Sequence, residues 1–150
     1  MPKLLPNSRR NGSLMEDNKV LDLKGAESLT LASEVVKILL EKKALDVKMF
    51  NVTGKTSVTD FYVNATGRSS TQVAALTDEV SELVKERGRE PLHIEGRGGN
   101  AWLLVDYGDV IVNVFDKPSR EFYNFDRHLP EECEVDISSL VAEVDKKYEL

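Results

Sequence analysis

The sequence predicts a single α/β domain in which five strands and four helices share one hydrophobic core. Three observations predict this class. Apolar residues recur at helical spacing in several stretches, five short runs have the pattern of strands, and glycine or proline separates many of these segments. At 150 residues, with 41% hydrophobic and 31% charged residues, the chain has the size and composition of one globular domain.

The predicted domain lies between a leader and a tail. Residues 1–27 mix proline, asparagine, glycine and charged residues without apolar periodicity, which is typical of a flexible leader. We expect the folded domain over residues 28–130. Residues 131–150 are predicted to form an acidic tail that carries a short amphipathic helix.

Two helices are predicted in the first half of the domain. The first begins near Ser28, and its apolar face consists of Leu31, Val35, Ile38 and Leu39. Ser69 and Gln72 have the spacing of a capping box, in which both side chains satisfy free backbone amides at a helix start. The second helix follows and ends at Gly88, because glycine readily adopts the left-handed conformation that closes a helix. Its apolar face consists of Val73, Leu76, Val80, Leu83 and Val84.

Five segments are predicted to be strands, of which Val58–Thr66 is rich in the β-branched and aromatic residues that suit a pleated surface. They cover Val47–Val52, Val58–Thr66, Leu92–Glu95, Ala101–Asp106 and Asp109–Phe115. The last two strands are joined tightly through Tyr107 and Gly108, which indicates a hairpin.

Two further helices are predicted after the hairpin. Pro118 suits the first turn of a helix, and a third helix is therefore expected over Ser119–Arg127. The fourth helix has a narrow apolar stripe made of Ile137, Leu140, Val141, Val144 and Tyr148. We expect this stripe to dock on its own domain, and docking on a partner is the alternative.

The predicted hairpin has two different faces. The expected cross-strand pairs are Asp106 with Asp109, Leu104 with Ile111, and Trp102 with Asn113. One face is aliphatic, which predicts that helices pack over it, and consists of Leu103, Val105, Val110, Val112 and Val114. The other face consists of Trp102, Leu104, Asp106, Asp109, Ile111 and Asn113.

The second face of the hairpin favours a recognition surface. It combines a tryptophan, aliphatic side chains, an amide and carboxylates, and unpaired charges are costly to bury in a dry core. Tryptophan is enriched among the residues that dominate interfaces, and carboxylates at the rim add selectivity for basic partners. Two alternatives remain, in which Trp102 covers the far side of the sheet beneath a helix or the tail, or is buried in a homodimer.

The charge of the chain narrows the class of partner. Its 26 acidic and 20 basic residues give a net charge of −6, which disfavours direct nucleic-acid binding and favours a basic protein. Leu4 and Leu5 form too short an apolar cluster for a signal-peptide core, and nothing approaches a transmembrane span. The single Cys133 fits a reducing compartment, so a cytoplasmic location away from membranes is expected.

These residues resemble the ribosomal silencing factor family of bacteria and organelles, also called Iojap-like proteins. The resemblance covers residues 29–129. Its most specific segments are Trp102–Val110 and Arg120–Tyr123, and the supporting segments are Thr59–Val63, Ser69–Val73 and Glu95–Gly96. Two positions depart from the family pattern. Asn113 stands where the family commonly has histidine, and Leu129-Pro130 replaces a frequent Leu-Trp pair.

The resemblance implies a fold, a partner and a mode of action. The implied fold is a mixed five-stranded sheet with helices packed mainly on one face, like that of nucleotidyltransferases but catalytically inactive, and usually homodimeric. The implied partner is the large (50S) ribosomal subunit through its protein fourteen, a basic protein, and binding there would block joining of the small subunit and repress translation. The family's contact strand corresponds to Trp102, Leu104 and Asp106, with Tyr107 and Asp109 at the turn.

The glycine-rich segment Glu95–Asn100 admits a second interpretation, a phosphate-binding loop of a nucleotide-binding or nucleotidyltransferase-type enzyme. A phosphate loop should open a helix, whereas these glycines lie between two predicted strands, and a turn is therefore favoured. A nucleotidyltransferase also needs closely spaced carboxylates on one strand to hold magnesium, but Asp106 and Asp109 straddle a turn. His93 and His128 do not form a metal-ligand pattern, and we expect no metal or cofactor.

Overall fold

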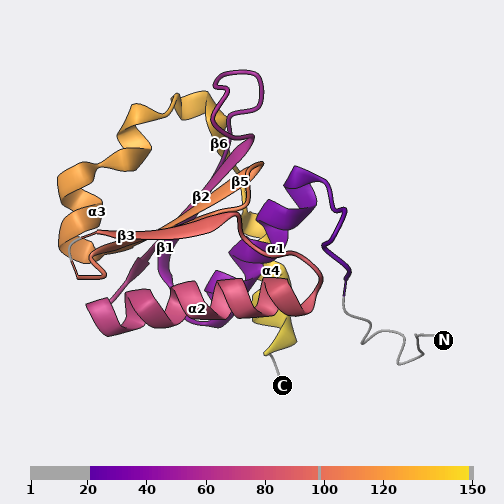
Figure 1. The fold of residues 1–150 in the computed structure, drawn as a ribbon, viewed down its shortest axis with the longest axis horizontal. Helices are drawn as coiled ribbons and strands as arrows, with labels where there is room; N and C mark the ends of the chain where they lie inside the picture. Colours follow the sequence, from indigo (N-terminus) through magenta and orange to yellow (C-terminus); the bar gives the residue numbers. More distant parts are fainter. Residues whose placement is uncertain (1–20, 98, 149–150) are drawn as a thin grey trace.

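The structure is a computed structural model that describes residues 21–97 and 99–148 (Figure 1). Within these residues, six strands and four α-helices make up the fold. The strands are β1 (Leu45–Asn51), β2 (Phe61–Gly67), β3 (His93–Arg97), β4 (Trp102–Asp106), β5 (Val110–Asp116) and β6 (Glu134–Val135). The helices are α1 (Ser28–Glu41), α2 (Ser70–Glu86), α3 (Lys117–Tyr123) and α4 (Ser138–Lys147). Two short 3-10 turns, η2 (Phe125–His128) and η3 (Glu131–Cys133), lie between α3 and β6.

All six strands form one mixed sheet in the order β3-β4-β5-β2-β1-β6. Strands β2 and β5 run parallel, and the other neighbouring pairs run antiparallel. The mixed α/β class is confirmed, but the expected count of five strands is wrong for the described residues. The sixth strand has two residues, Glu134 and Val135, which pair with Phe50 and Met49 of β1. Two residues are too few to show an alternating pattern, and so no sequence signal indicates this strand.

Helices α1, α2 and α4 lie on one face of the sheet, and α3 lies on the opposite face (Figure 1). The helix-covered face is aliphatic, as the hairpin pattern predicts. Its buried sheet residues include Val63, Ala65, Val105, Val110, Val112 and Val114. Each fully buried valine or leucine side chain contributes about 1.5–3 kcal/mol through removal of apolar area from water, and so this layer carries much of the stability.

The predicted capping box at the start of α2 is present with one difference. The Ser69 hydroxyl accepts a hydrogen bond of 3.1 Å from the backbone N–H of Gln72. The Gln72 side chain accepts in return from the backbone N–H of Arg68, one residue before the cap. At the other end, Gly88 has a φ of +102°, which agrees with the predicted left-handed close of the helix.

Helix α3 is shorter than the predicted Ser119–Arg127 and begins earlier. The Asp116 carboxylate accepts from the backbone N–H of Ser119 at 2.9 Å and caps the helix, with Pro118 in its first turn. The helix ends because Asn124 takes a left-handed conformation with a φ of +50°. The chain then continues as the turn η2.

Both ends of the described chain pack onto the domain. Leu23 is fully buried in the core, so the folded part begins before the predicted residue 28, and residues 1–20 of the predicted leader lie outside the described residues. At the other end, Val144 of α4 is buried and Lys37 of α1 pairs with Glu143 of α4 at 2.8 Å. The C-terminal helix therefore docks on its own domain, as expected. No helix within the described part of the chain has the length and apolar character needed to cross a bilayer.

The loop of the β4–β5 hairpin closes one residue later than predicted, because the backbone N–H of Tyr107 donates to the oxygen of Val110 at 2.9 Å. The observed pairs are Trp102 with Phe115, Leu104 with Asn113, and Asp106 with Ile111. The predicted register is therefore wrong by two residues. The physical reason is the turn itself, because the Asp106 carboxylate accepts from the backbone N–H of Gly108 at 2.7 Å and Gly108 has a φ of +91°. A slip of two residues keeps every side chain on its predicted face.

Candidate partner-binding surface

The sheet face opposite α1, α2 and α4 carries the residues predicted to recognise a partner. The strand register places one set of side chains from β3 and β4 together on this face. We call the set the Trp102 surface, and it consists of His93, Glu95, Trp102, Leu104 and Asp106. His93 and Glu95 are exposed, and the other three are partly exposed.

Trp102 is held within an aromatic cluster at the border of this surface. Its ring lies 4.9 Å from Phe115, 4.8 Å from Tyr123 of α3 and 6.2 Å from Phe125 of η2, measured between ring centroids. Offset and tilted ring contacts at such distances are favourable. Helix α3 and the turn after it therefore cover part of the indole, while part of it stays accessible.

The indole N–H of Trp102 begins a chain of side-chain hydrogen bonds that crosses the sheet. It donates to Asn113 of β5 at 3.0 Å, and Asn113 donates to Asn64 of β2 at 3.0 Å. Asn64 donates to the carboxylate of Asp126 in η2 at 2.6 Å. The guanidinium of Arg120 in α3 donates to the other oxygen of Asp126 at 2.7 Å. We call these five side chains the Trp102 relay.

Sequence reasoning placed Asn113 at the contact face rather than inside this relay, and it missed Asn64 and Asp126. Asn64 and Asn113 are fully buried and lie directly opposite each other in the parallel β2–β5 pair. Asparagine is depleted in strands, and so two asparagines inside otherwise apolar strands are the signal that indicates a buried polar pair. No sequence pattern near either asparagine indicates its connection to Asp126.

An acidic edge borders the surface on the turn side. The carboxylate of Asp106 lies 3.6 Å from His93, whose ring also lies 2.8 Å from Glu95. Burial, together with the negative charge of Asp106, raises the pKa of Tyr62 on β2. The exposed carboxylate of Glu95 and the partly exposed one of Asp106 suit contact with a basic group.

Three residues predicted for this site are buried beneath it. Tyr107 is 3% exposed, Ile111 is 6% exposed and Asn113 is fully buried. Burial also raises the pKa of the Tyr107 hydroxyl, which has no hydrogen-bond partner within the described residues. Tyr107 belongs to the main hydrophobic core, and the predicted residues that stay partly exposed on this face are Trp102, Leu104 and Asp106.

Asp109 has an internal partner. Its carboxylate accepts from the guanidinium of Arg89, which also donates to the backbone oxygen of Tyr107 at 3.0 Å. The backbone oxygen of Asp109 accepts from the N–H groups of Asp60 and Phe61. Asp109 therefore fastens the hairpin loop to its neighbours, and its charge is offset by Arg89.

Two exposed aromatic residues of α3 extend the apolar part of the surface. Tyr123 is 41% exposed and contacts Trp102, and Phe122 is 81% exposed and packs edge-on against Tyr123 with 5.1 Å between ring centroids. An exposed phenylalanine beside a partly exposed tryptophan is a feature of interaction sites rather than of inert surface. The predicted site contained neither residue.

The features that suggested nucleotide chemistry take structural roles. The glycine-rich segment forms the turn between β3 and β4, where Gly99 and Asn100 have φ values of +61° and +72°. This agrees with the turn interpretation. The carboxylate of Asp106 accepts a hydrogen bond from Gly108 in the loop, and the carboxylate of Asp109 accepts from Arg89. No cluster of three potential metal ligands occurs within the described residues.

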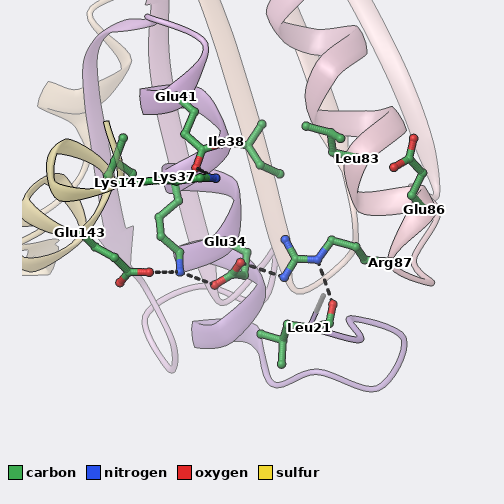
Figure 2. Close-up of a pocket in the computed structure, with 11 residues that line it drawn as sticks. Leu21, Glu34, Lys37, Ile38, Glu41, Leu83, Glu86, Arg87, Glu143 and Lys147 are labelled. Atoms are coloured by element: carbon green, nitrogen blue, oxygen red, sulfur yellow. Dashed lines mark hydrogen bonds and ion pairs between the residues drawn. The ribbon is translucent and has the colours of Figure 1, made fainter. Parts of the chain in front are cut away.

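A groove of about 700 Å³ lies on the other side of the molecule, between α1, α2 and α4 (Figure 2). Its apolar lining consists of Leu21, Ile38, Leu83 and Val144. Glu34 forms ion pairs with Lys37 and Arg87, each at 2.8 Å. Lys37 also forms an ion pair with Glu143 of α4. Burial alone would raise the pKa of Glu34, but its bonds to Lys37 and Arg87 outweigh this and lower it. The charges of this groove serve mainly to hold three helices and the segment at Leu21 together (Figure 2).

The fold and the Trp102 surface define a mixed α/β protein whose most distinctive feature is an aromatic and acidic sheet face. Residues 25–149 match the family described as ribosomal silencing factor during starvation, abbreviated RsfS. The match covers most of the chain, and this protein belongs to that family. The recognition from sequence segments is thereby confirmed.

Curated relatives and solved structures agree with the family match. The chain is 32% identical over 102 residues to the ribosomal silencing factor RsfS of Halalkalibacterium halodurans, which covers 68% of this chain and 87% of the relative. It is 33% identical over 101 residues to the chloroplastic protein Iojap of Arabidopsis thaliana, covering 67% of this chain and 42% of the relative. A crystal structure of a Chromobacterium violaceum protein superposes with a TM-score of 0.64 at 31% identity, over 67% of this chain and 83% of that one.

Proposed function

We propose that this protein binds the large ribosomal subunit through its protein fourteen, blocks joining of the small subunit sterically and so represses translation. Membership of the ribosomal silencing factor family supports a role at the ribosome. The observation that carries the contact is the partly exposed Trp102, Leu104 and Asp106 on a sheet face that the main helical layer leaves open. An apolar centre with an acidic rim suits a basic ribosomal protein.

In this mechanism, binding of the domain to the large subunit is sufficient for inhibition, and no catalytic step is needed. Trp102 and Leu104 supply apolar contact, and Asp106 and Glu95 face basic groups of the partner. The bound domain then fills space that the small subunit needs. If the two partners exclude each other, a free concentration one hundred times the dissociation constant weakens joining by about 2.7 kcal/mol, which suffices to silence most subunits.

Leu104→Lys tests the contact with little risk to the fold. Leu104 is partly exposed and lies opposite Glu95 of β3, so a lysine there gains an acidic neighbour while it repels a basic partner. We expect the variant to lose co-sedimentation with purified large subunits and to stop inhibiting subunit joining in light-scattering assays.

The matched control is Leu29→Lys. Leu29 is an exposed leucine on α1, away from the Trp102 surface, and the same substitution there changes the net charge equally. The control should bind as the wild type does. Equal binding by Leu104→Lys and the wild type would refute the contact face, and equal loss in both variants would indicate a general charge effect instead.

The proposal also includes a homodimer for the free protein, a cytoplasmic location and the absence of catalysis. Edge strand β3 and the residue before it expose apolar side chains, with Leu92 at 71% and Ile94 at 48% exposure, and such edges favour association. Sedimentation equilibrium of the free protein measures the dimer.

Calorimetry with magnesium and nucleoside triphosphates checks the enzyme alternative, because heat of binding would favour it.

A further inference from the structure

The Trp102 relay has a fixed direction of hydrogen-bond donation. The indole of Trp102 is only a donor, and the carboxylate of Asp126 is only an acceptor. Asn64 must therefore present its amino group to Asp126 and its carbonyl to Asn113. Asn113 in turn presents its carbonyl to Trp102. The two ends of the relay thus determine how both buried amides point.

The far end of the relay is anchored by a buried cation. Arg120 is 9% exposed, donates to Asp126 at 2.7 Å and also donates to the Thr66 hydroxyl of β2 at 2.8 Å. A charge-assisted bond of this kind is stronger than one between neutral groups. Breaking any inner bond would leave a buried polar group without a partner, so the arrangement favours one conformation.

We propose that Asn64, Asp126 and Arg120 are positioning residues that hold the Trp102 indole in its binding orientation. The relay joins β4, β5 and β2 to the turn η2, and the neighbouring residue of that turn, Phe125, contacts the indole ring directly. A side chain held in one rotamer loses less entropy when a partner binds. The role of these residues in affinity rests on the proposed function, whereas their hold on the indole does not.

The single tryptophan of the chain makes the indole directly observable. In a nitrogen-15 correlation spectrum of the full chain, its N–H gives one side-chain signal. Asp126→Asn keeps the shape of the side chain but replaces one acceptor oxygen with a donor group. We expect the indole proton to exchange with solvent at least about tenfold faster and its resonance to shift, because the direction of donation is no longer fixed.

A second relay variant and a stability control accompany this measurement. Asn64→Leu keeps a side chain of similar size and removes the central link of the relay. Thr77→Val removes a buried hydroxyl of α2 that donates to the Val73 oxygen at 2.8 Å, on the opposite face of the sheet. The control should lose stability while its indole signal and exchange rate stay as in the wild type.

Binding to purified large subunits gives the functional half of the test. Both relay variants should bind about tenfold more weakly than the wild type, and Thr77→Val should bind equally well. An unchanged indole signal in Asp126→Asn and Asn64→Leu would overturn the relay. A released indole with unchanged affinity would overturn the positioning role. Should the wild type itself fail to bind, the proposed function falls, while the indole signal still decides whether the relay holds Trp102.

Discussion

Asn113 accepts the indole N–H of Trp102 at 3.0 Å, although the two residues are diagonal neighbours in the sheet rather than direct partners. Trp102 lies opposite Phe115, and Asn113 lies opposite Leu104. The indole therefore reaches across to the adjacent pair and fastens itself to β5. One side chain thus supports the fold with its nitrogen and leaves part of its ring accessible, which makes Trp102 a poor choice for separating binding from stability.

Trp102→Phe is expected to destabilise the protein. Phenylalanine retains aromatic packing but cannot donate, and so the buried carbonyl of Asn113 loses its partner at a cost of about 1–3 kcal/mol. Urea unfolding followed by circular dichroism measures the change. Tyr123→Phe, which removes the hydroxyl of an exposed tyrosine in the same cluster, should stay within about 0.5 kcal/mol of the wild type. Equal stability of the two variants would contradict a structural role for the indole nitrogen.

Tyr107→Phe is expected to leave the protein as stable as the wild type or to stabilise it by about 1 kcal/mol. The Tyr107 hydroxyl is buried without a hydrogen-bond partner in the described part of the chain, and an unsatisfied buried hydroxyl is unfavourable. Binding to large subunits should be unchanged, because Tyr107 is buried in the main hydrophobic core. Thermal unfolding and co-sedimentation check both statements, and a clear loss of affinity would return Tyr107 to the contact site.

The elements that could be predicted from the sequence have local causes. The cap at Ser69, the left-handed Gly88 and the two faces of the β4–β5 hairpin all follow from residues close together in the chain. The predicted hairpin register is wrong by two residues because the loop closes one residue later than expected, where the backbone N–H of Tyr107 donates to the oxygen of Val110 and the Asp106 carboxylate accepts from Gly108. The predicted faces of the hairpin are nevertheless correct, because side chains alternate along a strand with a period of two residues.

The buried part of the site has nonlocal causes. Asn64 and Asn113 are 49 residues apart, and only the parallel pairing of β2 with β5 brings them together. Likewise Leu23 and β6 join the domain through contacts with distant elements. No periodicity or motif encodes such pairings within one sequence, and so the accessible edge of the site was predictable while its support was not.

Asp106→Asn and Asp109→Asn should separate a contact charge from a structural one. The amide introduced by Asp106→Asn keeps an oxygen that accepts from Gly108, so the loop is retained while a partly exposed charge is lost. We expect Asp106→Asn to slow association with large subunits several-fold and to reduce the salt dependence of the rate. Asp109→Asn should leave that rate unchanged and cost about 1 kcal/mol of stability, because Arg89 loses its carboxylate. Stopped-flow association at two salt concentrations gives the comparison, and equal effects on the rate would contradict the assignment.

Glu34 should make stability depend on pH in the acidic range. Its pKa in the folded protein lies below the ordinary value of 4.5, because bonds to Lys37 and Arg87 outweigh the effect of burial. The unfolded chain then binds a proton more readily than the folded one. The stability that Glu34 contributes is therefore present above pH 4.5 and is lost as the pH falls through the lowered pKa. Urea unfolding between pH 7 and pH 3 measures this loss.

Glu34→Gln isolates that contribution from the other carboxylates. At pH 7 the variant should be less stable by about 1 kcal/mol, because Arg87 and Lys37 lose a shared, half-buried partner. The difference from the wild type should shrink as the pH falls, since the protonated Glu34 no longer attracts its neighbours. Glu86→Gln, on the rim of the same groove and outside the ion-pair chain, should show no such convergence (Figure 2). A constant difference between Glu34→Gln and the wild type across the whole range would mean that the ion pairs do not hold α1, α2 and α4 together.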